Sequence, residues 1–284
     1  KDMATTTPYN PDAYPDYNAT KESTSEAPTQ PFVAYSTQSN PDWHQGHCVL
    51  DSGKMIRLGF IRKVYGILMF QMVITVGTVC FFMFYEPART WIVKNIWFMW
   101  VNIVLSILVL IGLFFKRQSH PLNMILLVLW TFMESLMIGT VCGAYSCTPE
   151  TRADGTDYCA VNVDGQRAIA QAFGITALIF VCLTVFTIQS KIDFSFLGLG
   201  LSVALMVLIF WGFFIWIFDA GWTSYYLYSL FGAIIFALYI VYDTWLLTKR
   251  LSPDEYILAA INLYLDVINL FLFILALLGG GRRD

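Results

Sequence analysis

Long apolar segments recur along this chain from residue 64 onward, separated mostly by short polar stretches. Each segment has about 20 residues or more, the length that an α-helix needs to cross the hydrocarbon core of a bilayer. The pattern predicts seven spans, at residues 64–85, 96–115, 122–145, 168–189, 194–217, 222–247 and 256–278. Because most connections are short, consecutive helices are expected to run antiparallel and to pack as one bundle.

The composition favours a membrane protein over the soluble classes. Hydrophobic residues make up 57% of the 284 residues and charged residues only 13%. A soluble domain carries about 25% charged residues, so this chain has too little polar surface to coat a globule in water. A formal net charge of −3 gives no broad basic surface for nucleic acid. We therefore predict an all-α integral membrane protein, a seven-transmembrane-helix bundle.

The N-terminal region differs in composition from the rest of the chain. Six of the ten prolines lie within the first fifty residues, among many Tyr, Ser, Thr and Asn residues. Such a segment cannot bury enough apolar surface to offset the entropy lost when its backbone is ordered. We expect a disordered polar tail over residues 1–55 and a membrane domain over residues 56–284.

Lysine and arginine residues near the span ends predict the orientation. Nine lie on the side of the tail: Lys54, Arg57, Arg62, Lys63, Lys116, Arg117, Lys191, Lys249 and Arg250. Six lie on the other side if all seven segments span: Arg89, Lys94, Arg152, Arg167, Arg282 and Arg283. The excess of positive charge predicts a cytosolic N-terminus. Either the last segment spans fully and leaves the C-terminal arginines outside, or it is re-entrant and returns them to the cytosol; we favour seven full spans.

Two cysteines bracket the one long polar loop, which is predicted to be non-cytosolic. Cys147 and Cys159 are expected to form a disulfide there if the compartment is oxidising, and two free thiols are the alternative. The sequence has neither a CxxC motif nor a cluster of Cys and His, so neither zinc nor another resident cofactor is expected.

Three acidic residues lie within the predicted spans: Glu134, Asp243 and Asp266. A charged side chain at the bilayer centre costs at least about 2.5–3.5 kcal/mol on insertion scales, so each needs a partner or a function. Two interpretations of Glu134 stay open. It either remains protonated and hydrogen-bonds to a neighbouring helix, or it lines an ion pathway.

The other two acidic residues are expected to meet inside the bundle. Their helices are joined by a tight turn in which Ser252 is suited to the N-cap, Pro253 to the first helical position and Glu255 to a capping box. Asp243 and Asp266 lie at similar distances from this turn. The difference in their distances from the turn is about 7 Å at 1.5 Å per residue, which helix tilt can absorb.

A polar stripe on the last helix points to a pathway at this position. Asn262, Asp266 and Asn269 recur at i, i+4 and i+7, and Tyr242 adds a hydroxyl beside Asp243 on the facing helix. We expect the stripe to line a pathway, and hydrogen bonding between helices is the alternative. Two carboxylates that are close together in a dry site cannot both stay ionised, so the pair should respond to pH as a unit. Their oxygens also suit transient binding of Ca²⁺.

Intramembrane aspartyl proteases also use two aspartates within membrane helices. Tyr242-Asp243 matches the first half of their signature, but Asp266 follows Leu263-Tyr264-Leu265 instead of a GxG sequence, and no Pro-Ala-Leu motif occurs. We therefore expect no enzyme activity.

At these positions the chain resembles the Bax-inhibitor-motif, or lifeguard, family. The resemblance extends from about Ile56 to Leu278. It is carried by His120-Pro121-Leu122-Asn123, Glu134, Tyr242-Asp243-Thr244, Leu251-Ser252-Pro253-Asp254-Glu255-Tyr256, Asn262-Leu263-Tyr264-Leu265-Asp266 and Asn269-Leu270-Phe271. One position departs from the family pattern, since Trp245 stands where the family usually has Gln.

The resemblance implies a seven-helix protein linked to Ca²⁺ leak from intracellular stores and to suppression of cell death. The two functional aspartates of the family fall on Asp243 and Asp266, as a proton-sensing pair at the gate. The partners would be the lipid bilayer and Ca²⁺, and the membrane that of the ER, the Golgi or a related compartment, with the mitochondrial inner membrane as an alternative. Trp245 is expected to close the pathway or repack the pair, so a second hypothesis is a non-conducting accessory subunit of a larger membrane complex.

Overall fold

A computed structural model describes residues 54–116, 119–218 and 221–279 of the chain. These residues belong to one compact unit. Nearly all of the predicted tail over residues 1–55, and the arginines at 282 and 283, lie outside the described residues.

Seven helices of the described chain are long and apolar enough to cross a membrane. They are α1 (Lys54–Phe84), α3 (Trp97–Lys116), α4 (Leu122–Tyr145), α5 (Val163–Gln189), α6 (Leu197–Phe218), α7 (Trp222–Lys249) and α8 (Tyr256–Gly279), the last preceded by the 3-10 turn η2 (Pro253–Glu255). Each helix coincides with one predicted span, which confirms the all-α seven-helix membrane fold. α1 begins at Lys54, well before residue 64, because the basic residues preceding the apolar segment continue the helix. α8 runs unbroken for the length of a full span.

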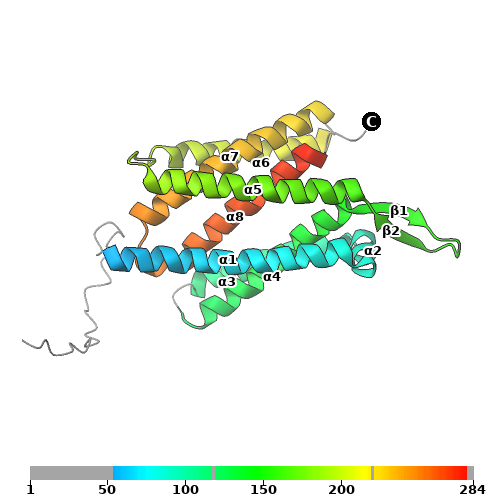
Figure 1. Ribbon diagram of the computed structural model, residues 1–284, viewed down its shortest axis with the longest axis horizontal. Helices are drawn as coiled ribbons and strands as arrows, with labels where there is room; N and C mark the ends of the chain where they lie inside the picture. The colour runs from blue at the N-terminus through cyan, green and yellow to red at the C-terminus, as the bar shows by residue number, and fades with distance from the viewer. Residues whose placement is uncertain (1–53, 117–118, 219–220, 280–284) are drawn as a thin grey trace, which may run out of the picture. The chain divides into compact units, whose positions relative to one another are not determined.

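Two elements at one end of the bundle were not predicted. Helix α2 (Glu86–Lys94) follows α1 directly, and strands β1 (Cys147–Thr151) and β2 (Asp157–Val161) form an antiparallel hairpin where a long loop was expected. The turn of the hairpin places Gly155 at a φ of 81°, a conformation that glycine adopts readily. Both elements are short and polar, so they lack the long apolar run that identifies a span. We call this end of the bundle, where α2 and the hairpin lie together in Figure 1, the hairpin end.

Helix α8 forms the centre of the bundle. It packs against α7, α5 and α1 and also touches α4, and in Figure 1 it runs obliquely between α1 and α5. Ala260, Leu263 and Tyr264 of α8 are completely buried. The peripheral helices α3 and α6 are the least buried spans, and each packs mainly against one neighbour, α4 and α7 respectively. Their outward apolar side chains are suited to contact with lipid.

Exposed tryptophans gather at the hairpin end. They are Trp91, Trp97, Trp100, Trp216 and Trp222, from α2 and from the adjoining ends of α3, α6 and α7. Tryptophan concentrates where the hydrocarbon core meets the head groups, because its ring is apolar and its N–H is polar. This belt marks one membrane boundary and places the hairpin outside the hydrocarbon.

The start of α5 is held very close to the end of α4. The side chain of Asn162 caps α5 by accepting a hydrogen bond from the backbone N–H of Gly165. A Cβ at Gly165 would lie 1.8 Å from the carbonyl oxygen of Tyr145, which is a main-chain atom and cannot swing aside. The glycine therefore permits the contact between the two helices that flank the hairpin.

Replacing Gly165 with alanine is expected to destabilise the protein, because the backbone of α4 or α5 must shift to admit the new methyl group. Overpacking of this kind costs about 1–3 kcal/mol or more. The matched control is Gly174→Ala on the same helix, where a Cβ has nothing within 4 Å and should add about 0.5–1 kcal/mol through helix propensity. Thermal unfolding of the purified proteins in detergent measures both, and equal melting temperatures would contradict the close contact.

Candidate functional site

The structure brings Asp243 of α7 and Asp266 of α8 together inside the bundle. The two carboxyl groups are close enough to interact electrostatically. Asp266 is only 5% exposed and Asp243 is partly buried. Because carboxylates only accept hydrogen bonds, a bond between two carboxyl groups requires an O–H on one of them.

One oxygen of the pair is left without a partner. Oδ2 of Asp266 is buried and accepts no hydrogen bond from any described residue. A buried acceptor without a partner costs about 1–3 kcal/mol, and in native structures such an atom calls for an explanation.

Tyrosines of α7 connect the aspartate pair to α6. Tyr239 interacts electrostatically with both aspartates. The hydroxyl of Tyr242, which we expected to line a pathway, lies against Gly198 of α6, where a Cβ would be 2.6 Å away. A displacement of α7 at the pair would therefore also disturb its contacts with α6.

The asparagines of the predicted stripe lie at the edge of the buried surface of α8. Asn262 and Asn269 are both partly buried. The side-chain amide of Asn269 donates to the carbonyl oxygen of Leu265 at 2.8 Å, within its own helix. Because of their helical spacing, the two asparagines lie on the same face of α8 as Asp266.

The turn before α8 differs in detail from the prediction. Ser252 stands at the N-cap of η2, but its side chain makes no capping hydrogen bond, so the expected capping box is wrong. The backbone N–H of Glu255 bonds to the carbonyl oxygen of Ser252 instead, because the chain begins with a tighter 3-10 turn. The next residue, Tyr256, is covered by the ammonium of Lys63, 3.3 Å from its ring centroid, which ties the start of α8 to α1.

Trp245 packs away from the aspartate pair. Two residues along an α-helix correspond to a rotation of about 200°, so Trp245 and Asp243 point in nearly opposite directions. The indole is buried against Phe194, which precedes α6, and against Val241. Trp245 therefore does not repack the two aspartates, which corrects that expectation.

Glu134 lies at the interface of α3 and α4. Its carboxyl group accepts a hydrogen bond from the hydroxyl of Ser106 at 2.5 Å. One turn earlier on α3, the amide of Asn102 donates to the carbonyl oxygen of Met133 at 2.8 Å. Glu134 also interacts electrostatically with Tyr264 of α8. This arrangement favours the interpretation of Glu134 as a hydrogen-bonding residue between helices.

A ladder of polar residues along α1, which the sequence analysis missed, joins α1 to α4 and α8. Its three hydrogen bonds run from Gln71 to Thr131 at 2.9 Å, between Thr75 and Tyr264 at 2.8 Å, and between Thr78 and Ser135 at 3.1 Å. The α1 residues recur at i, i+4 and i+7, the same spacing as the stripe on α8, so the sequence contained a signal for this ladder.

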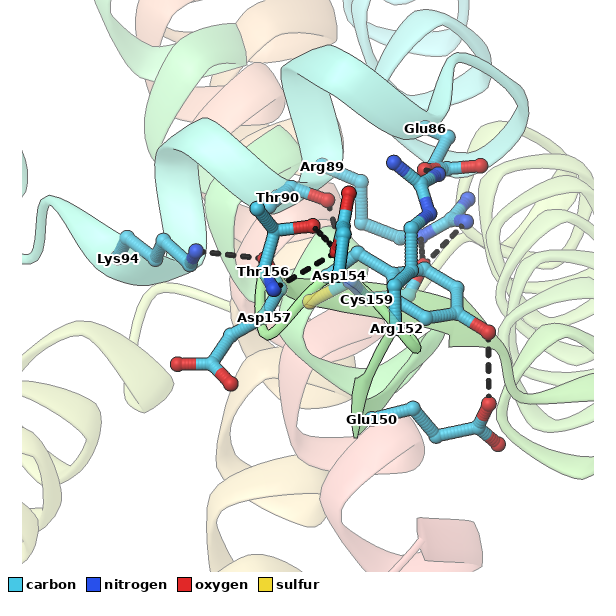
Figure 2. Close-up of polar contacts among 11 residues, drawn as sticks. Glu86, Arg89, Thr90, Lys94, Glu150, Arg152, Asp154, Thr156, Asp157 and Cys159 are labelled. Atoms are coloured by element: carbon cyan, nitrogen blue, oxygen red, sulfur yellow. Dashed lines mark hydrogen bonds and ion pairs between the residues drawn. The ribbon is translucent and has the colours of Figure 1, made fainter.

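At the hairpin end, a buried arginine clamps β2 onto α2 (Figure 2). Arg89 is 1% exposed. It donates from Nη2 and Nε to the carbonyl oxygen of Cys159, at 2.8 and 3.3 Å, and from Nη1 to that of Met83 at 2.6 Å. The N–H of Cys159 donates to the hydroxyl of Thr90 at 3.1 Å. Cys159 is also bonded to Cys147 in a disulfide.

Exposed polar contacts surround this clamp. Arg152 forms an ion pair with Glu86 of α2, and its guanidinium lies over the ring of Tyr158. At the turn of the hairpin, the hydroxyl and the backbone N–H of Thr156 hold the pKa of Asp154 below its ordinary value. Figure 2 shows Arg152 beside Glu86, and Asp154 beside Thr156.

No group of three or more His, Cys, Asp or Glu side chains could hold a metal ion within the described ranges. The aspartate pair is a site of two carboxyl groups. Such a site suits a proton or a cation in transit better than a resident metal, which takes six or more oxygen ligands in the case of Ca²⁺.

Comparison with known proteins identifies the family. A family model described as "Inhibitor of apoptosis-promoting Bax1" matches residues 57–283. The chain is 38% identical over 248 residues to the Golgi anti-apoptotic protein of Vaccinia virus. This alignment covers 87% of this chain and 96% of the viral protein. It is 36% identical to protein lifeguard 4 of Mus musculus, covering 84% and 91%, and 35% identical to Bax inhibitor 1 of Schizosaccharomyces pombe, covering 95% and 89%. With its seven spanning helices, this chain belongs to the Bax inhibitor, or lifeguard, family of integral membrane proteins.

Proposed function

We propose that this protein is a pH-sensitive Ca²⁺ leak channel of an intracellular membrane, with Asp243 and Asp266 as the gate and with a role in restraining cell death. The observation that carries the proposal is the pair of interacting, buried or partly buried carboxyl groups between α7 and α8. The names of the relatives, an anti-apoptotic protein and a Bax inhibitor, support the role in cell death.

The physics of the pair explains how a proton would control the gate. While the pair holds a proton, a hydrogen bond links α7 to α8. If both carboxyl groups are ionised, two unit charges about 4 Å apart repel by about 4 kcal/mol at an effective dielectric constant of 20. The charged pair relieves this repulsion by separating or by binding a cation. The oxygens of a charged pair, including the buried Oδ2 of Asp266, are ligands of the kind that Ca²⁺ prefers.

The conformation supports a closed state of such a gate. Asp266 is 5% exposed and lies between helices that pack along much of their length. Tyr242, next to Asp243, packs against Gly198, so a change at the pair reaches α6. Because α6 packs mainly on α7, these two helices form the unit that moves in the proposed gate.

Replacing either aspartate with asparagine is expected to flatten the pH dependence of Ca²⁺ leak into liposomes that contain the purified protein. Asparagine keeps the shape but removes the titrating group, and one shared proton changes the ratio of two states by at most about tenfold per pH unit. The double variant Asp243→Asn, Asp266→Asn should differ little from either single variant, since the two residues titrate as a unit.

The control is Glu134→Gln. In the described structure the carboxyl group of Glu134 lies between α3 and α4 and is bonded to Ser106. It should change the size of the leak more than its pH profile. A wild-type pH profile in both aspartate variants would contradict the gate. A wild-type protein that passes no Ca²⁺ at any pH, and that purifies only within a stoichiometric complex, would favour the accessory-subunit hypothesis.

We propose further that the tail is cytosolic and the hairpin faces the lumen of an endomembrane, the Golgi or the ER. Two single substitutions test this orientation, because each completes an Asn-x-Ser/Thr glycosylation site. Asp154→Asn precedes Gly155 and Thr156 at the turn of the hairpin, and Asp193→Asn precedes Phe194 and Ser195 between α5 and α6. Both aspartates accept hydrogen bonds through Oδ1, and asparagine retains an acceptor there.

Glycosylation is expected in the first variant and not in the second, as measured by the mass removed on treatment with an N-glycosidase. The control Asp154→Gln changes the charge in the same way and creates no site. Sugar on the second variant alone would contradict the proposed orientation and indicate the reverse one. Sugar on neither variant would favour the mitochondrial inner membrane, which N-glycosylation does not reach.

A further inference from the structure

We propose that Cys147, Cys159 and Arg89 form a redox-active thiol–disulfide site that exchanges with a small thiol in solution. In this site Cys147 is the sulfur that the incoming thiolate attacks, Cys159 is the leaving group, and Arg89 is the cation that stabilises it. The proposal rests on the hairpin end alone and does not depend on Ca²⁺ conduction.

The two cysteines of the disulfide are not equally exposed. Cys159 is 4% exposed and lies on the strand that is clamped to α2, whereas Cys147 is partly exposed at the first position of β1. Thiol–disulfide exchange requires a thiolate to reach one sulfur while the other departs, so access decides which sulfur is attacked. The geometry therefore assigns the attack to Cys147 and the departure to Cys159.

The buried charge lies beside the departing cysteine. Arg89 is 1% exposed, and its described hydrogen bonds all end on main-chain carbonyl oxygens, those of Met83 and Cys159. The two ion pairs found among the described residues, Arg152–Glu86 and Arg167–Asp164, do not involve it. The guanidinium is therefore bonded to the main chain of Cys159. A cation near a thiolate stabilises it, and a leaving thiolate that is stabilised departs faster.

The clamp also allows the disulfide to form again. When the bond opens, the contacts from Arg89 and Thr90 still hold the backbone of Cys159 on α2. The other strand remains fixed at its start, where the N–H of Asn162 bonds to the carbonyl oxygen of Ser146. The two sulfurs thus stay near each other, as a reversible site requires and as a purely structural cross-link does not.

The exchange balances with two molecules of a thiol such as glutathione. The first attacks Sγ of Cys147 as a thiolate, the protein S–S bond breaks, and Cys159 leaves as a thiolate. The second attacks the glutathione sulfur of the mixed disulfide and releases Cys147. The two protons of the glutathione thiols end on the two cysteines, and the two electrons that reduce the protein come from the formation of glutathione disulfide.

The test compares the rate at which glutathione reduces the full-length protein in detergent, for wild type, Arg89→Gln, Arg89→Lys and Arg152→Gln. Samples are quenched with an alkylating agent and the state of each cysteine is read by peptide mass spectrometry. Arg89→Gln should slow reduction by about 3- to 10-fold, since the thiolate loses its cation. Arg89→Lys, which keeps the charge, should recover most of the rate. Arg152→Gln removes an exposed cation from the same hairpin and should leave the rate within about 2-fold of wild type.

A purely structural role of Arg89 predicts a change in the reduction rate in the opposite direction. If Arg89 only holds β2 in place, its removal loosens the hairpin and glutathione reduces the disulfide faster, which would overturn the proposal. A second measurement uses the unmodified protein and remains valid if Arg89→Gln does not fold. Brief exposure to glutathione should leave the mixed disulfide on Cys147. Adducts mainly on Cys159, or equally on both cysteines, would also overturn the proposal.

Discussion

The burial of α8 in the middle of the bundle is the constraint on which the rest of the structure depends. A central membrane helix is surrounded by protein, so any polar group on it must find its partner on another helix. Tyr264 of α8 bonds to Thr75 of α1, and Asp266 interacts with Asp243 of α7. These contacts fix the rotation of α8 about its axis. A turn of α8 in either direction would bring Asp266 against apolar side chains, at the cost of burying an unpaired polar group.

The two faces of α8 use polar groups with different physical properties. On the face toward α1, hydroxyl and amide groups join at fixed distances of about 3 Å, and these bonds are neutral at every physiological pH. On the face toward α7, the partners are two acids, which can bond to each other only while a proton is present. The first interface is therefore suited to holding the helices together at any physiological pH, whereas the second consists of groups that can gain or lose a proton.

The sequence was sufficient to predict the seven spans and the meeting of the two aspartates, because both follow from helix length and from distance to a turn. It was insufficient for features that depend on which neighbour a side chain meets. Ser106 lies on another helix from Glu134, so the partner of that acid was not visible. Trp245 was expected to disturb the pair, although helical rotation alone places it on the opposite side. The ladder beginning at Gln71 could have been predicted, because its residues have the same i, i+4, i+7 spacing as the stripe on α8.

The buried ionisable groups at the hairpin end and in the membrane interior differ in how their charge is compensated. Between α7 and α8 the two acidic groups, Asp243 and Asp266, become neutral if they bind a proton. Arg89 cannot release its proton, so its charge persists and is met by the carbonyl oxygens of Met83 and Cys159. Partial charges on carbonyl groups balance a cation less completely than a carboxylate does. The remaining positive potential falls on the atoms nearest the guanidinium, which belong to the strand that carries the disulfide.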